Sequence, residues 1–228
     1  KELLMVDFHV MLSSEFAGDG MDAASALRYA SLAGLRFIGL TIPCDGSDLS
    51  RIGPLAAHVR RLSLYANVEA RTGVELRHVP PALLPDLVLE SRKAGAELVV
   101  VYGETLCDQV EPGTNVAAIE AGADILAHPG LIDDKCAGFA AERGVALEFT
   151  SCPIHALANA HTAAMALHFG APLVRGSAAK CASDMSTRSF WPQVIRGSNV
   201  FGEKDGKSNL LELIDKSEYA LIKKLMHR

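Results

Sequence analysis

The chain of 228 residues is 49% hydrophobic and 21% charged, with a formal net charge of −5. This composition indicates a globular protein with one large core. The negative charge, without a long run of Lys and Arg, argues against a nucleic-acid partner and against binding to a membrane surface. No apolar run is long enough to cross a bilayer, and residues 1–6 predict a strand and not a signal peptide. The five cysteines include no CxxC pair, so we expect reduced thiols in a cytoplasmic protein.

Apolar runs alternate with helical patterns along the whole chain, and no linker separates them. The apolar runs predict strands buried on both faces, at residues 3–10, 37–42, 73–76, 98–102, 125–127, 145–150 and 173–177. Helical patterns occupy residues 23–33, 49–66, 82–94, 115–121, 134–142, 156–169 and 208–225. Several helices end just before a glycine, where a left-handed C-cap is favoured. This rhythm predicts an α/β fold with a single domain over residues 1–228, closed as a TIM-like (β/α)7 barrel.

Polar side chains stand at the ends of the predicted strands. His9, Glu75 and His128 belong to three different strands, and Tyr102 and Lys180 stand at the ends of two others. The chemistry of a barrel gathers at the carboxyl ends of its strands. Imidazoles and a carboxylate that converge from several strands are typical of a metal site, although a single histidine there is more often a hydrogen-bonded core residue.

Several motifs carry a resemblance to a known family. They include "VDFHVMLSSEF", "GVELRHVPP", "VVVYGET", "EPGTNVAAIEAGADILAHPG" and "IHALANAHTAAMALHFGAPLV". The chain resembles the PHP (polymerase and histidinol phosphatase) superfamily, most closely the short histidinol-phosphate-phosphatase-like proteins, up to about residue 185. The resemblance implies a distorted seven-stranded barrel with a site of two or three metal ions that hydrolyses phosphate esters.

The resemblance also shows which metal ligands this chain has lost. Three ligand positions remain, at His9, Glu75 and His128. The other positions of the family pattern are taken by Met11, Ile42, Pro43, Tyr102, Ala178 and Lys180. Three ligands do not rebuild a multinuclear site, so we expect no bound metal and no other cofactor. The survivors are then expected to form a hydrogen-bonded polar cluster.

The replacements are mostly apolar, and they suggest a different chemistry. A lysine amine in an apolar pocket loses its proton more easily and can form a Schiff base with a carbonyl compound. We therefore expect Lys180 to carry aldol or retro-aldol chemistry on a small carbonyl substrate, with Tyr102 as proton carrier. The predicted substrate-binding residues are Met11, Ile42, Pro43, Cys152, His155 and Ala178.

Other interpretations stay open at this point. A residual phosphoesterase would use His9, Glu75 and His128 around one metal ion, since three protein ligands and an open position are a known catalytic arrangement. A barrel that only binds a small molecule is a second alternative. The loss of ligands fits a deliberately redesigned scaffold as well as a natural relative that has been repurposed. The sequence does not fix the oligomeric state.

Overall fold

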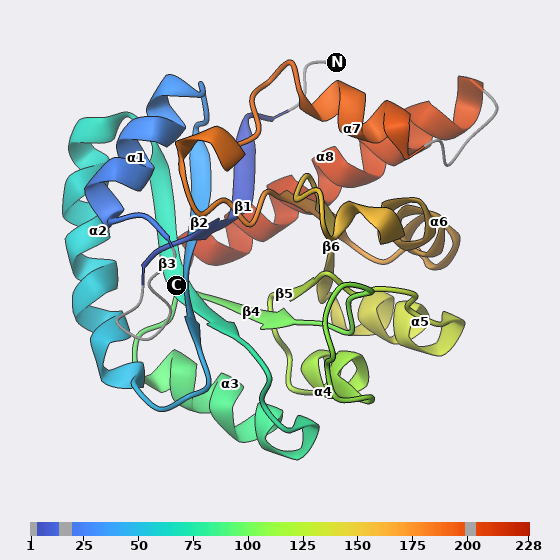
Figure 1. The fold of residues 1–228 in the computed structure, drawn as a ribbon, viewed down its shortest axis with the longest axis horizontal. Coiled ribbons are helices and arrows are strands. Elements are labelled where there is room, and N and C mark those ends of the chain that lie inside the picture. The colour runs from blue at the N-terminus through green and yellow to red at the C-terminus, as the bar shows by residue number, and fades with distance from the viewer. Residues whose placement is uncertain (1–3, 14–19, 199–203) are drawn as a thin grey trace.

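The computed structural model describes residues 4–13, 20–198 and 204–228, and within them seven parallel strands form a nearly closed barrel (Figure 1). The strands are β1 (Val6–Met11), β2 (Phe37–Cys44), β3 (Glu69–Leu76), β4 (Leu98–Tyr102), β5 (Ile125–Ala127), β6 (Ala146–Thr150) and β7 (Leu173–Gly176). All seven predicted strands are confirmed, although β3 begins earlier than its apolar run. Residue 3, the first of the first predicted strand, lies outside the described residues.

Helices follow the strands and cover the outside of the barrel. They are α1 (Ala23–Leu32), α2 (Ile52–Ala66), α3 (Leu84–Lys93), α4 (Thr114–Glu120), α5 (Asp134–Arg143), α6 (Asn159–Phe169), α7 (Trp191–Gly197) and α8 (Lys204–Met226). Short 3-10 turns stand at Leu49–Arg51, Pro81–Leu83, Ala156–Ala158 and Ala182–Asp184. The sequence pattern did not predict α7. None of the helices in the described part of the chain is both long and apolar enough to cross a membrane.

Local chemistry sets the ends of these helices. The carboxylate of Asp22 accepts a hydrogen bond from the backbone N–H of Ser25 and so caps α1. Asp133 caps α5 in the same way. Gly144 and Gly170 follow α5 and α6 with φ of 65° and 72°, which is the left-handed C-cap that the glycine pattern predicted.

Each strand pairs in parallel with the next one, from β1 to β7. The seam between β7 and β1 is closed at its carboxyl end by an isolated bridge between Val10 and Ala179. There the backbone N–H of Met11 donates to the carbonyl of Ala179 over 2.8 Å. The carboxyl ends of all seven strands therefore surround one opening.

A bulge in β1 turns one side chain into the barrel. Asp7 pairs with Ile38 and Val10 pairs with Leu40, so β1 has one residue more than β2 between these pairs. Phe8 packs with the apolar residues of the barrel interior, and Val10 packs against α1 and α2. The extra residue lets His9 face the interior directly after Phe8.

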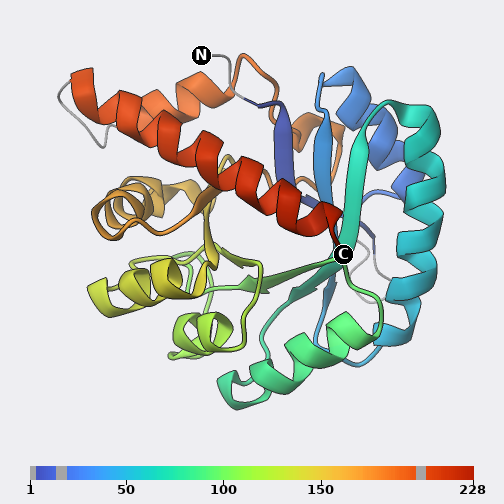
Figure 2. The same cartoon turned by 180° about the vertical axis from the view of Figure 1, so that it is seen from behind.

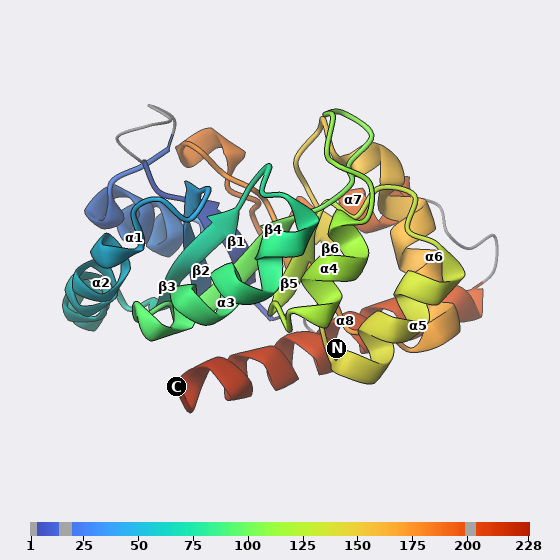
Figure 3. The same ribbon diagram turned by 90° about the horizontal axis from the view of Figure 1, so that it is seen from below.

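Helix α8 closes the opposite end of the barrel, beneath the amino ends of the strands (Figures 2 and 3). Leu221 and Leu225 of α8 join the apolar cluster inside the barrel. The Arg175 guanidinium of β7 binds Glu218 of α8 with two hydrogen bonds of 2.8 Å, and both side chains are buried. This bidentate pair fixes α8 to the seam strand.

Asp124, just before β5, is the second polar anchor of α8. Its buried carboxylate lies 2.9 Å from Lys224, 2.8 Å from Arg228 and 2.9 Å from Arg92, and it accepts the backbone N–H of Val99. Burial would raise the pKa of Asp124, but the three cations and the hydrogen bonds outweigh it and hold that pKa below its usual value.

We expect Asp124→Asn to lower the free energy of unfolding at pH 7 by about 3 kcal/mol, because it leaves three cations without their shared carboxylate. Since the folded pKa is depressed, the stabilisation is complete above pH of about 4 and is lost as pH falls through the folded value. Urea unfolding at several pH values measures the difference, which should shrink in acid. The exposed Glu90→Gln variant is the control, and equal stability of Asp124→Asn and wild type would contradict the role.

Candidate metal centre

Three buried side chains from three strands meet inside the carboxyl end of the barrel. His9 comes from β1, Glu75 from β3, and His128 directly follows β5. One donor atom from each of the three lies within 4.8 Å of the others, and Nε2 of His9 is 3.2 Å from Oε1 of Glu75. The structure brings these three side chains together in one buried polar cluster. The bulge in β1 brings His9 to Glu75.

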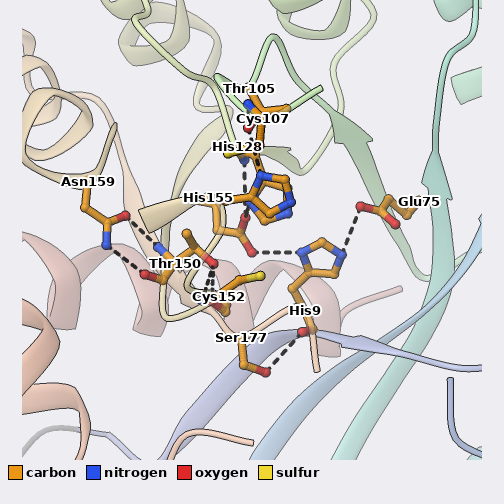
Figure 4. A network of polar contacts seen from close by, with 12 residues as sticks. His9, Glu75, Thr105, Cys107, His128, Thr150, Cys152, His155, Asn159 and Ser177 are labelled. Carbon is orange, nitrogen blue, oxygen red and sulfur yellow. Dashed lines mark hydrogen bonds and ion pairs between the residues drawn. The ribbon is translucent and has the colours of Figure 1, made fainter. Parts of the chain in front are cut away.

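Glu148 of β6 contacts both imidazoles of this cluster, and Figure 4 shows His9 and His128 together with Glu75. Its Oε1 lies 2.8 Å from Nδ1 of His9, and its Oε2 lies 2.8 Å from Nδ1 of His128. The same Oε2 accepts the backbone N–H of His128 over 3.2 Å. A carboxylate that accepts from Nδ1 places the proton there and leaves Nε2 as a free donor atom for a metal. One carboxylate therefore orients two histidines at once.

Two of the candidate ligand atoms, Nε2 of His9 and Oε1 of Glu75, are ion-paired to each other over 3.2 Å. Nε2 of His9, Nε2 of His128 and Oε1 of Glu75 are buried without a hydrogen bond of normal geometry. Buried polar atoms are costly to leave unsatisfied. Two imidazoles and one carboxylate are also a known ligand set for catalytic zinc, with one position left open. The donor atoms thus fit a single divalent ion.

Two neighbouring carboxylates favour the protonated form of His9. Burial would lower the pKa of His9, but the carboxylates of Glu148 and Glu75 outweigh it and raise that pKa to about 10. Burial would raise the pKa of Glu75, but His9 and Arg77 outweigh it and lower that pKa to about 2. His128 and His9 likewise hold the pKa of Glu148 far below its usual range, against the effect of burial.

Arg77 supports Glu75 from the side away from the histidines. Its Nε donates to Oε2 of Glu75 over 2.6 Å, and its guanidinium lies 4.8 Å from the centre of the Tyr102 ring. Glu75 therefore directs one oxygen to His9 and the other to Arg77. This arrangement fixes the carboxylate in one orientation.

Aromatic rings cover the other side of the cluster. His155 stacks on His128 with 3.8 Å between ring centres, and its Nδ1 is 2.8 Å from the hydroxyl of Thr105. Tyr102 meets both imidazoles edge-on. Burial and the neighbouring His128 lower the pKa of His155 to about 4, whereas burial raises the pKa of Tyr102.

Strained backbone gathers around the same opening. His128, His78 and Ala178 have φ of 50°, 51° and 49°, a left-handed conformation that costs a non-glycine residue about 1 kcal/mol or more. Each of the three follows the end of a strand, at β5, β3 and β7. Such strain is concentrated at functional sites, and here it marks the carboxyl end of the barrel.

The structure places the other predicted site residues outside the cluster of His9, Glu75 and His128. Met11 is buried, with its sulfur 3.6 Å from the guanidinium of Arg77. Ile42 and Pro43 line a cavity that Arg77 also lines. Cys152 is half-buried after β6, and Ala178 is buried at the seam.

Lys180 does not have the apolar environment that the Schiff-base hypothesis expected. Its side chain is exposed, and it lines a separate hollow with Met21, Tyr29 and Cys181 rather than the cavity of Arg77. Tyr102 lies beside His128 and His155 instead. The Schiff-base hypothesis stays a prediction. The structure does not give Lys180 the burial that would lower the pKa of an amine.

Sequence reasoning missed Glu148, Asp7 and Arg77. Glu148 and Asp7 are charged residues inside otherwise apolar strands, and this is the signal that could have revealed them. Asp7 accepts the backbone N–H groups of His9 and Ser177, over 3.1 and 3.0 Å, and so joins the bulge to the seam. Nothing in the sequence pairs Arg77 with Glu75 specifically.

A natural protein is similar to most of the chain. The uncharacterized protein MJ1295 of Methanocaldococcus jannaschii is 30% identical over 197 residues, which cover 85% of this chain and 89% of that protein. The chain belongs to the same family as MJ1295. No family model matches the chain. That the scaffold of this chain was deliberately redesigned stays a prediction.

Solved structures share the fold at much lower identity. Histidinol phosphate phosphatase of Lactococcus lactis, complexed with zinc, L-histidinol and phosphate, has a TM-score of 0.59 at 13% identity, covering 95% of this chain and 94% of that chain. Ochratoxinase of A. niger gives 0.59 at 9% identity, covering 96% and 71%. A Xaa-Pro dipeptidase with bound methionine gives 0.57 at 12% identity, covering 98% and 75%. The MJ1295-family chain therefore shares its fold with this phosphatase and with an amidohydrolase, which gives a TM-score of 0.56 at 10% identity.

Gly176 makes room for the carboxylate of Glu148. A methyl group at Gly176 would overlap with Glu148 and crowd Cβ of His9. We expect Gly176→Ala to lower the free energy of unfolding by about 2 kcal/mol or more, because the two imidazoles prevent Glu148 from moving aside. Gly197→Ala, where a methyl group meets nothing within 4 Å, is the matched control. Thermal unfolding of both variants measures the effect, and a neutral Gly176→Ala would contradict the rigidity of the cluster.

The exposed position of Lys180 predicts how fast its amine reacts with a carbonyl probe. A 1,3-diketone, which traps reactive amines as enaminones, should label Lys180 no faster than Lys93 and Lys135, because all three side chains are exposed to solvent. Peptide mapping after partial labelling compares the three rates. Selective labelling of Lys180 would instead restore the Schiff-base hypothesis.

Proposed function

We propose that this chain is a metal-dependent hydrolase that holds one divalent ion, preferably zinc, between His9, Glu75 and His128. The observation that carries the proposal is Glu148, whose two oxygens contact Nδ1 of both histidines, so that Nε2 of each histidine and Oε1 of Glu75 remain as candidate ligand atoms. Carboxylate partners behind metal-binding histidines are a recurrent feature of zinc sites. Among the described residues, Nε2 of His128 is buried without a hydrogen bond, and a metal ion would give this atom a partner.

The ligand set suits catalysis as well as binding. Two histidines and one carboxylate leave one position open, and zinc so held supplies Lewis-acid chemistry for the hydrolysis of phosphoester, ester or amide bonds. The similar fold of a phosphatase complexed with zinc and phosphate supports the same class of reaction for this chain. The proposal follows the alternative of a residual phosphoesterase, and it leaves the choice among these bonds open.

The protein's own groups have separate roles in this proposal. Glu148 sets the tautomers of His9 and His128, and Arg77 sets the direction of Glu75. His155 covers one face of His128, and Thr105 fixes the orientation of the covering ring. The rings exclude water from that side, so the substrate must approach from the side of Glu75 and Arg77.

Zinc binding tests the metal site directly. Protein stripped with a chelator should take up one zinc ion per chain, measured by competition with a colorimetric zinc indicator. We expect Glu75→Gln to weaken zinc binding at least about 100-fold, because it removes the only charged ligand, and Glu148→Gln to weaken it by about 10- to 100-fold. The exposed His168→Gln is the control and should bind zinc like wild type. Equal zinc affinity of Glu75→Gln and wild type would contradict the proposed ligands.

Hydrolysis tests the activity. We expect the zinc-loaded protein to cleave at least one member of a panel of chromogenic phosphoesters, carboxyl esters and peptide anilides. Chelation should abolish the rate and zinc should restore it, and Lys180→Met should leave it unchanged. A rate that persists in Glu75→Gln without zinc, or a loss of the rate in Lys180→Met, would contradict a metal-dependent mechanism.

A further inference from the structure

A cavity opens beside the metal centre, at the carboxyl ends of β2 and β3. Its volume is about 440 Å³, within the usual range of small-molecule sites. Its walls are formed by Ile42, Pro43, Cys44, Asp45, Ser47, Asp48, Arg51, Arg77 and His78. Pro43 pairs with Glu75 across the two strands, so the cavity adjoins the cluster directly.

Arg77 belongs both to this cavity and to the metal centre. Its Nε binds Oε2 of Glu75, and its Nη2 is 3.6 Å from the sulfur of Met11, which is a weak acceptor. The side chain is 26% exposed and lies over the ring of Tyr102. A guanidinium carries five N–H donors in a planar fork that matches an oxyanion. Arg77 thus keeps donor capacity on the side of the cavity.

The remaining charges in the walls have carboxylate or backbone partners. Arg51 lies 3.6 Å from Asp48, and His78 lies 3.3 Å from Asp108 outside the cavity lining. The carboxylate of Asp45 accepts the backbone N–H of Ser47. Arg77 is therefore the cation of this cavity that also touches the catalytic cluster.

The charge of the loaded centre favours a negative ligand. A divalent ion with neutral His9 and His128, the carboxylates of Glu75 and Glu148, and the Arg77 guanidinium leave a net charge of about +1. This charge would lie in a largely buried site, where electrostatic attraction is strong. The apolar side chains of Ile42 and Pro43 line the same cavity, and they suit an uncharged body attached to the anion.

We propose that Arg77 binds an oxyanion of the substrate, a carboxylate or a phosphoryl group, while Ile42 and Pro43 receive its apolar part. This assignment rests on the proposed function, because that function is what places a scissile bond next to Arg77. It makes Arg77 the residue that decides between anionic and neutral substrates. Arg51, whose charge is balanced by Asp48, has no such role.

Calorimetry with three probes of one shape tests this assignment: benzoate, phenylphosphonate and neutral benzamide. Zinc-loaded wild type should bind at least one of the two anions at least tenfold more tightly than benzamide, and the tighter anion identifies the preferred oxyanion. Arg77→Gln should lose this preference. Arg77→Lys, which keeps the charge near Glu75 but not the planar fork, should keep part of it, and it serves if Arg77→Gln does not fold. Arg51→Gln is the matched control and should keep the preference within threefold.

The outcomes separate this inference from the proposed function. Zinc affinity is measured for every variant, and the titrations are repeated without zinc, where weaker but still Arg77-dependent anion binding is expected. Zinc binding together with an unchanged anion preference in the Arg77 variants would overturn the inference and leave the proposed function standing. Failure to bind zinc, together with Arg77-dependent anion binding, would overturn the proposed function and leave the inference about Arg77 standing. A wild type without anion preference in either state, or an equal loss in Arg51→Gln, would also overturn the inference.

Discussion

The contact of one carboxylate with two imidazoles is the constraint on which the candidate site depends. Glu148 binds Nδ1 of His9 and Nδ1 of His128 in a place that is closed to solvent. A buried carboxylate with ordered partners cannot rotate without losing hydrogen bonds, and each lost bond is costly in a low dielectric. The two histidines are therefore held even when no ion is bound. Preorganisation of this kind separates a metal site from a collection of polar residues.

The rest of the barrel provides the space and direction for this contact. A single extra residue in β1 turns His9 inward after Phe8, and Asp7 secures that irregular segment to β7 through Ser177. Gly176 leaves the room that Glu148 occupies. At the other end of the barrel, α8 is anchored by buried ion pairs and plugs the interior. The ion pairs that anchor α8 thus lie at one end of the barrel, and the site lies at the other.

The sequence predicted the fold well because strands, helices and C-cap glycines each follow local rules. It also identified His9, Glu75 and His128, and it placed them in one polar cluster. It did not predict the bulge that turns His9 toward Glu75, because the extra residue leaves no trace in the apolar pattern of β1. Lys180 is the opposite case. Its position after a strand suggested a buried amine, but the chain turns at Ala178, with φ of 49°, and the lysine side chain lies at the surface. Strand-end position alone does not decide which way a side chain points.

The central claim is that His9, Glu75 and His128 form one metal site behind a shared carboxylate. A crystal of the protein grown with zinc, measured at wavelengths on both sides of the zinc absorption edge, tests it most directly. The account predicts one anomalous peak per chain, bonded to these three side chains, with Glu148 still in contact with both Nδ1 atoms. A zinc ion bound elsewhere, or a cluster that stays empty at saturating zinc with His9 still paired to Glu75, would contradict it.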